Sequence, residues 1–265
     1  MTPAHEASLE IAEGFLACAD RTLWHPASGT AILSDLHLGY EGRLRRAGTA
    51  MPDFALDKLL EAWRGVLKRR PRRIIIAGDI FHEAVPGAEA LGQWNALVAA
   101  LGNALAGPAP RRCKVAVLPG NHDPPLSELA RIVGGGPVAV APLADVGGWT
   151  VCHGDVWPAE PSGLPGCGDG LAERKGLVVG HQHPAVVLGD GVQREKMICF
   201  AYCQPPGKLP FIVLPPFSPA PLGSNLLTAG QWILNTAAPP ARDVTIFGIV
   251  GEQVLDFGRL DRICG

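Results

Sequence analysis

The sequence has no long apolar run, no secretory start and no cysteine pattern of a zinc finger. Its apolar stretches fall well short of the roughly 20 residues that a membrane-spanning helix needs. The first residues include acids and lack the basic start and apolar segment of a secretory signal, so we expect a cytoplasmic protein with no membrane partner. The seven cysteines contain no Cys-x-x-Cys pair, and we expect most of them to be buried as small hydrophobic side chains rather than paired in disulfides.

Neither sign of charge is in excess. The 265 residues include 23 Lys and Arg against 25 Asp and Glu, which gives a formal net charge of -2. With 47% hydrophobic residues, this composition excludes a disordered chain and supplies enough apolar surface for a core. It also excludes a broadly basic surface for nucleic acid, although not a local basic groove. No repeat, charge block or low-complexity linker divides the chain, so we expect a single domain over residues 1–265.

Short apolar runs that end in polar residues are the strongest structural signal. These runs cover residues 30–33, 73–77, 114–118, 149–152 and 176–179. They are rich in Val and Ile and show no alternation, which is typical of strands that are buried on both faces of a sheet. Polar residues directly after such strands lie at the carboxyl edge of the sheet, where open α/β sheets bind their ligands.

Helical periodicity occupies the intervals between these strands. Apolar residues recur at helical spacing over 53–70 and 88–106, and a shorter helix is expected over 126–133. Segments 244–250 and 253–257 predict a hairpin, and residues 11–24 predict another. The stretch 204–225 contains seven prolines, which exclude a continuous helix, but its Phe-Ile-Val-Leu core is typical of a short strand. These patterns predict an α/β protein that combines βαβ units with antiparallel strands.

The ends of the five predicted strands carry histidine, carboxylate or asparagine side chains. These residues are Asp35, His37, Asp79, Asn121, His122, Asp123, His153, His181 and His183. Taken singly, each is explained equally well by a structural hydrogen bond, a turn or a helix cap. Their recurrence at one edge of the sheet favours a metal site, because imidazole, carboxylate and amide oxygen together are typical ligands of Mn, Fe or Zn. The set is too large for one four-coordinate zinc, and a carboxylate such as Asp79 can bridge two cations.

These polar motifs follow one another in a specific order between Ser34 and Pro184. In chain order they are Asp-x-His, Gly-Asp, Gly-Asn-His-Asp, His-Gly-Asp and Gly-His-Gln-His. This order resembles that of the calcineurin-like metallophosphoesterases. Longer matches at 35–41, 46–48, 78–82, 180–184, 196–200 and 214–217 are similar to the ligase-associated, PdeM-type phosphoesterases and to the SbcD-related, ICC-like group. The resemblance implies a four-layer αββα sandwich of two mixed β-sheets flanked by helices.

The resemblance also implies a role for each polar residue. One metal would be held by Asp35, His37, Asp79 and His183, and the second by Asn121, His153 and His181 together with Asp79 as the bridge. His122 would lie near the leaving-group oxygen as a general acid or a stabiliser of the transition state, oriented by Asp123. A hydroxide activated by both metals would attack phosphorus. We expect two divalent ions, with Mn favoured and Fe or Zn as alternatives.

Contacts with substrate are less well defined by the sequence. Where many members of the wider superfamily have an Asp, this chain has His82, which either contacts substrate or has a structural role. Arg43 and Arg46 follow the first metal motif, and they either contact phosphate or begin an exposed helix. A second basic run at 68–73 precedes its strand, so we expect it to be a solvated helix end.

The predicted function is a metal-dependent phosphoesterase that prefers phosphodiesters. The resemblance implies DNA or nucleotide phosphodiesters as substrate, a nuclease role in DNA repair, and a functional link to a DNA ligase and a helicase. One alternative is hydrolysis of a small nucleotide or of a nucleotide-linked lipid such as UDP-diacylglucosamine. Another is a non-catalytic binding protein on a degenerate form of the same fold. The complete set of predicted ligands argues against that last alternative.

Overall fold

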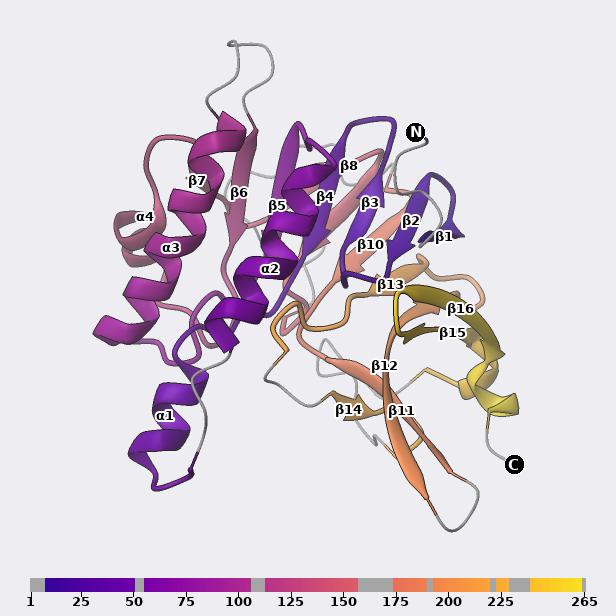
Figure 1. Cartoon of the computed structure of the whole chain (residues 1–265). Coiled ribbons are helices and arrows are strands. Elements are labelled where there is room, and N and C mark those ends of the chain that lie inside the picture. Colours follow the sequence, from indigo (N-terminus) through magenta and orange to yellow (C-terminus); the bar gives the residue numbers. More distant parts are fainter. Residues whose placement is uncertain are drawn as a thin grey trace.

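Two β-sheets form the body of the molecule (Figure 1). The computed structural model describes residues 8–50, 55–105, 113–156, 174–189, 193–219, 223–228 and 239–263. The strands of the first sheet follow chain order: β1 (Ser8–Ala12), β2 (Phe15–Cys18), β3 (Leu23–His25), β4 (Thr30–Leu33), β5 (Arg73–Ala77), β6 (Lys114–Leu118) and β7 (Val138–Val140). Pairing is antiparallel from β1 to β4 and parallel from β4 to β7.

The second sheet is also mixed. Its strand order is β14 (Ser224–Asn225), β11 (Pro184–Gly189), β12 (Arg194–Cys203), β13 (Phe211–Val213), β10 (Gly176–Val179), β9 (Trp149–Cys152) and β8 (Ala144–Val146). Strand β12 also pairs with β15 (Val244–Val250), which pairs in turn with β16 (Gln253–Arg259). Because β9, β10 and β13 run parallel, their carboxyl ends lie at one edge. The two mixed sheets agree with the sandwich that the sequence implies.

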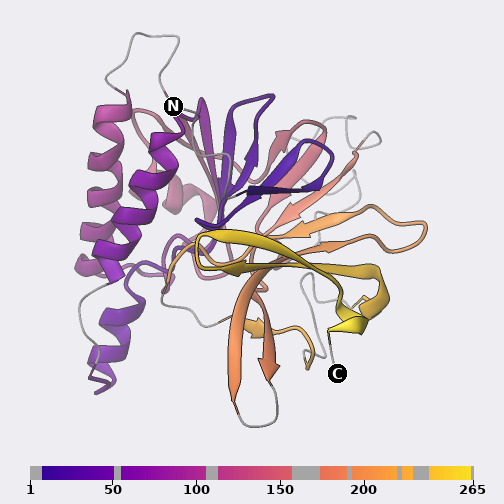
Figure 2. The same cartoon turned by 45° about the vertical axis from the view of Figure 1, so that its right-hand side comes forward.

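The described α-helices gather on one side of the molecule (Figures 1 and 2). They are α1 (Tyr40–Arg46), α2 (Ala55–Lys68), α3 (Ala88–Leu105) and α4 (Leu126–Val133). Trp63 of α2 and Leu97 of α3 share a buried cluster with Ile76 of β5, so these helices cover the outer face of the first sheet. No described helix is long and apolar enough to cross a membrane.

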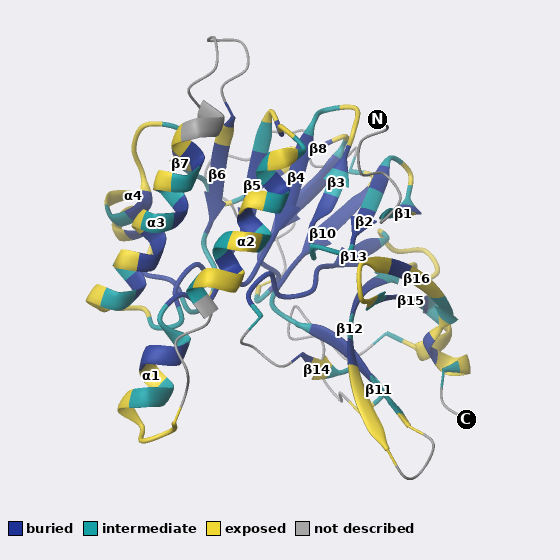
Figure 3. Ribbon diagram, viewed as in Figure 1, coloured by how far each residue is buried: buried dark blue, intermediate teal, exposed yellow. Residues whose placement is uncertain are grey.

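Successive residues of β5 enter two different cores. Ile74 and Ile76 pack against the helices, whereas Ile75 packs with Phe200 and Ile212 of the second sheet. All three isoleucines are fully buried, as the dark blue strands of Figure 3 show for the sheets in general. A strand covered on both faces needs apolar residues at every position, and this need explains the continuous run in the sequence.

Most of the predicted elements are confirmed. Strands β4, β5, β6, β9 and β10 and helix α4 have the predicted bounds. The predicted helix at 53–70 is α2, whose first predicted residues lie outside the described part of the chain. The N-terminal hairpin is a three-stranded meander, β1 to β3, and the C-terminal hairpin ends at Arg259 rather than Phe257. Arg43 and Arg46 lie on helix α1, as one of the two alternatives predicts, but this helix begins earlier, at Tyr40. The long strand β12 is absent from the prediction.

The cysteines in the described part of the chain are free and buried, as expected. They are Cys18, Cys113, Cys152, Cys199 and Cys203. Burial raises the pKa of Cys18 and of Cys113 to about 11, so both thiols stay protonated near neutral pH. Cys167 and Cys264 lie outside the described residues.

Candidate metal centre

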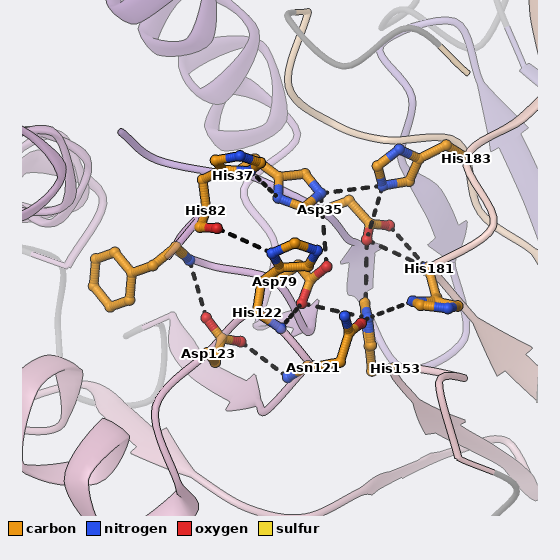
Figure 4. A network of polar contacts seen from close by, with 12 residues as sticks. Asp35, His37, Asp79, His82, Asn121, His122, Asp123, His153, His181 and His183 are labelled. Carbon is orange, nitrogen blue, oxygen red and sulfur yellow. Dashed lines mark hydrogen bonds and ion pairs between the residues drawn. The ribbon is translucent and has the colours of Figure 1, made fainter. Parts of the chain in front are cut away.

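The predicted polar residues converge where the carboxyl ends of five strands meet (Figure 4). The first sheet supplies its residues just after β4, β5 and β6, and the second sheet just after β9 and β10. The residues drawn together are Asp35, His37, Asp79, Asn121, His122, Asp123, His153, His181 and His183, with His82 beside them. Parallel pairing within each sheet therefore produces the clustering that the motif positions predict.

One group of possible metal ligands consists of Asp35, His37 and His183. Nε2 of His183 lies 3.2 Å from Nε2 of His37 and 3.2 Å from Oδ1 of Asp35. Atoms that bind one metal at about 2.0–2.2 Å lie about 3.0–3.5 Å from one another, so this spacing is that of ligands around a single ion. The two imidazole nitrogens and the carboxylate oxygen fit a transition metal.

A second group consists of Asp79, His153 and His181. Nε2 of His153 lies 3.2 Å from Nδ1 of His181 and 3.4 Å from Oδ1 of Asp79. The Asn121 side chain joins this group, because its Oδ1 lies 3.1 Å from the same nitrogen of His153. Imidazole nitrogen, carboxylate oxygen and amide oxygen thus surround a second possible metal position, with the same spacing between ligand atoms as in the first group.

Asp79 connects the two groups. Its Oδ2 lies 3.6 Å from Nε2 of His37, and its Oδ1 lies 3.4 Å from Nε2 of His153. The side chain is only 2% exposed, and the backbone N–H of His122 also donates to Oδ1, which fixes the orientation of the carboxylate. One oxygen therefore faces each group, which is the arrangement that a bridging ligand requires.

Several of these residues have an unusual backbone conformation. The φ angles of Asp35, Asp79, His181 and His183 are +57°, +51°, +65° and +49°, in the left-handed region that side chains disfavour. Glycine is needed beside them: a Cβ on Gly78 would lie 2.2 Å from Nδ1 of His153. Such strained residues persist where the surrounding structure holds them and are typical of functional sites.

Charge in the centre favours bound cations. Burial lowers the pKa of His37 to about 4, so its imidazole is neutral and able to act as a ligand at neutral pH. Burial acts in the same direction on His153, but hydrogen bonding to Asp79 and the nearby Asp35 carboxylate raise its pKa to about 10. Burial would raise the pKa of Asp35, but the hydrogen bond and charge of His183 hold it below the ordinary value. The two buried carboxylates of Asp35 and Asp79 thus make the electrostatic potential of the centre negative, which favours cations.

His122 has a different partner from the one predicted. Its Nδ1 donates to the carbonyl oxygen of His82 over 3.0 Å, and the rings of the two histidines stack with centroids 5.3 Å apart. Asp123 instead accepts the backbone N–H groups of Phe81 and Gly120, and burial raises its pKa to about 6. Asp123 therefore acts on His122 through the loop that carries it and not through a bond to the imidazole.

The predicted substrate contacts differ in their surroundings. His82 lies next to the first group, with its Nδ1 3.4 Å from Nδ1 of His37. Nη1 of Arg43 lies 3.2 Å from Nε2 of His82, so Arg43 reaches the edge of the histidine cluster. Arg46 instead forms an ion pair with Glu83 at 2.8 Å. Of the two arginines, the geometry therefore favours Arg43 as a contact for substrate.

The proline-rich segment borders the centre. Phe217 donates its backbone N–H to the carbonyl of Ser34, and Ser218 donates to that of Asp35. Nη1 of Arg21 donates to the carbonyl of Ser218 over 2.8 Å. This segment thus supports the backbone of Asp35 from the side of the second sheet. In the sequence, the Leu-Pro-Pro-Phe block at 214–217 is the feature that could have indicated this position.

Comparison with known proteins places the chain in a family. Residues 30–192 match the family described as calcineurin-like phosphoesterase. The crystal structure of the nuclease MPE from Pseudomonas putida is similar, with a TM-score of 0.55 and 17% identity over 94% of this chain and 98% of that one. A protein of unknown function from Aquifex aeolicus resembles it more loosely, with a TM-score of 0.35 and 17% identity over 58% of this chain and 78% of the other. Among curated proteins, no sequence matches the chain. Because the family match spans more than half of the chain and includes both ligand groups, the chain belongs to the calcineurin-like phosphoesterases, a family with dinuclear metal sites.

Proposed function

We propose that the protein is a phosphodiesterase that hydrolyses DNA or nucleotide phosphodiesters with two divalent cations. The shared carboxylate of Asp79, with one oxygen facing each ligand group, is the observation that carries this proposal. When bound, two such cations would lower the pKa of a water molecule and neutralise charge on the phosphoryl oxygens. The Pseudomonas putida protein of similar fold is called a nuclease, which supports the choice of a nucleic-acid phosphodiester.

The ligand groups have the composition that two cations need. Asp35, His37 and His183 would hold one ion, and Asn121, His153 and His181 the other, with Asp79 between them. We propose Mn²⁺ as the ion, with Fe or Zn as alternatives, because imidazole, carboxylate and amide ligands suit all three. The backbone N–H of His181 donates to the carboxylate of Asp35 and that of His122 to the carboxylate of Asp79, and these bonds orient both carboxylates before any ion binds.

His122 is the proposed group that acts on the leaving oxygen. The carbonyl of His82 can only accept a hydrogen bond, so Nδ1 of His122 carries the proton in that bond. In the doubly protonated imidazolium Nε2 carries a proton as well, which it would donate to the leaving group or use to stabilise the charge there. Asp123 positions His122 through the backbone, because it holds the N–H groups of Gly120 and Phe81.

The biological setting remains a proposal as well. We propose a cytoplasmic enzyme of DNA repair with a functional link to a DNA ligase and a helicase. Hydrolysis of a small nucleotide or a nucleotide-linked lipid would be favoured instead if the gene had neighbours in lipid A synthesis. Ligase or helicase genes beside it would favour the repair role.

The choice of diester over monoester has a direct test. We expect the Mn²⁺-loaded protein to hydrolyse bis-p-nitrophenyl phosphate faster than p-nitrophenyl phosphate, measured as kcat/KM under the same conditions. Both substrates release the same chromophore, so the comparison isolates the second ester group. A clear preference for the monoester would reject the phosphodiesterase assignment, although not the metal centre.

Arg43 and Arg46 provide a matched pair for the substrate contact. Because Arg43 reaches His82 and Arg46 is paired with Glu83, we expect Arg43→Ala to raise the KM for an oligonucleotide about tenfold. Arg46→Ala should change the KM by no more than about twofold, since a paired surface arginine contributes little. Equal effects of the two substitutions would show that Arg43 has no special role.

A further inference from the structure

A patch of unpaired cations lies at the end of the first sheet opposite the metal centre. We call Lys68, Arg70, Arg72 and Lys114 the basic patch; all four are exposed. Lys68 ends α2, Arg70 and Arg72 lie in the connection to β5, and Lys114 begins β6. Figure 1 shows the end of α2 and the starts of β5 and β6 at one end of the sheet, away from α1. Within the described ranges, no hydrogen bond or ion pair engages these four side chains.

The members of the basic patch are close neighbours. The backbone N–H of Lys114 donates to the carbonyl of Arg72 over 3.0 Å, so these two residues are adjacent across β5 and β6. The backbone N–H of Arg70 donates to Leu67, which folds the connection back onto the last turn of α2. Two other cations of this stretch have partners: Arg69 pairs with Asp20, and Arg73 donates to the carbonyl of Asp145. The patch therefore consists of the cations that the fold does not use.

Stability of the helix does not account for the basic patch. A cation in the last turn of a helix complements the helix dipole, and Lys68 has that position. Arg70, Arg72 and Lys114 lie outside α2 and gain nothing from its dipole. In a chain of net charge -2, unpaired cations at one end create a local positive potential that attracts polyanions.

The surroundings of the patch favour a phosphate backbone over an acidic protein. Protein partners are held mainly by buried aromatic and apolar anchors. The exposed large hydrophobic residues of the described chain are Val85, Leu126, Val156, Leu209, Val250 and Leu255, none of which belongs to α2, β5, β6 or the connection between α2 and β5. Phosphate contacts need only Lys and Arg and carry no sequence information. We propose that the basic patch binds the phosphate backbone of nucleic acid, independently of sequence and outside the metal centre.

The distance between the patch and the metal centre sets the length of nucleic acid that can reach both. Strand β5 runs from Arg73 beside the patch towards Asp79, six residues or about 20 Å. A duplex advances about 3.4 Å per base pair, so about six base pairs are needed to span this distance. The choice of nucleic acid as partner rests on the proposed function, whereas the presence of the patch does not.

Binding of labelled DNA tests the proposal. Fluorescence anisotropy would measure the binding of a labelled 30-nucleotide single strand and of a labelled 30-base-pair duplex to the full chain. EDTA in the buffer prevents cleavage. Lys68→Gln/Arg72→Gln/Lys114→Gln should weaken binding about tenfold or more and reduce the slope of log affinity against log salt by about 2 to 3. The matched control is Lys58→Gln/Lys208→Gln/Arg262→Gln, which removes three equally exposed cations elsewhere. Circular dichroism and thermal melting of both variants would confirm that they fold.

Two results would overturn the proposal. Equal weakening by both triple variants would mean that net charge alone governs binding. If polyglutamate bound to the patch while the DNA affinity of the patch variant stayed unchanged, the partner would be an acidic protein segment. Hydrolysis of bis-p-nitrophenyl phosphate by the unaltered protein tests the proposed function separately, because this small diester reaches only the metal centre.

Discussion

Replacing Asp79 by alanine is expected to abolish hydrolysis of bis-p-nitrophenyl phosphate and to prevent binding of the full pair of metal ions. The carboxylate is 2% exposed and offers one oxygen to each ligand group, so its removal takes a ligand from both positions at once. The substitution also removes the acceptor for the backbone N–H of His122, which releases the loop that carries this residue. We expect kcat/KM to fall by about 10³-fold or more, equivalent to about 4 kcal/mol of transition-state stabilisation.

Metal binding and catalysis should be measured together on this variant. Isothermal titration with Mn²⁺ would give the number of ions bound, and the chromogenic diester would give the rate. Asp145→Ala is the control, because Asp145 is an exposed carboxylate on β8 and outside both ligand groups. A variant Asp79→Ala that bound two ions and kept its rate would show that the shared carboxylate is not a ligand.

The sequence predicted the part of this centre that depends on strand ends. Buried parallel strands such as β5 require continuous apolar runs, and the chain must leave the sheet directly after them. A polar residue at that point, such as Asp79 or His153, therefore has one place to lie, at the carboxyl edge. Parallel pairing of β4 with β5 and of β9 with β10 then places the motifs that follow these strands side by side.

What the sequence did not predict depends on contacts between distant segments. Helix α1 has only seven residues and begins after Gly39, so its own propensity is too weak to decide between a helix and a phosphate contact at Arg43 and Arg46. It is held instead from α3, where Gln93 accepts the N–H of Gly39 and Glu89 pairs with Arg45. The partner of His122 escaped prediction for the same reason, because it is a backbone carbonyl that any residue could supply at that position.

The left-handed conformations at the metal centre are a further feature that periodicity cannot show. Asp35 and Asp79 both follow a buried strand, and each turns its backbone into the left-handed region there. The N–H of Asp35 donates to the carbonyl of Gly78, and that of His37 donates to the carbonyl of Asp79. These two backbone hydrogen bonds link the turn after β4 to the turn after β5 and hold both in place. Their partners are distant in the sequence, so only the tertiary structure supplies them.

His122→Ala is expected to leave metal binding intact while it lowers the rate. The side chain lies with His37 and His82 in a third cluster of possible ligands but in neither of the two groups joined by Asp79, and its Nδ1 is committed to the carbonyl of His82. Loss of a group that stabilises charge in the transition state typically lowers the rate about 10²- to 10³-fold, so hydrolysis of bis-p-nitrophenyl phosphate should be largely abolished. The KM should change little, because the cations would still bind the phosphoryl oxygens.

The size of the loss on different substrates distinguishes the two roles of His122. p-Nitrophenolate leaves readily without a proton, whereas the alkoxide of a DNA strand does not. A general acid therefore predicts a larger loss for His122→Ala on DNA than on the chromogenic diester, and a pure charge stabiliser predicts similar losses on both. Asp123→Asn keeps the shape of the side chain but leaves one acceptor for the two N–H groups of Phe81 and Gly120, so it should loosen the loop yet cost less activity than the loss of the imidazole. Rates of His122→Ala that match the unaltered protein on both substrates would exclude His122 from the reaction.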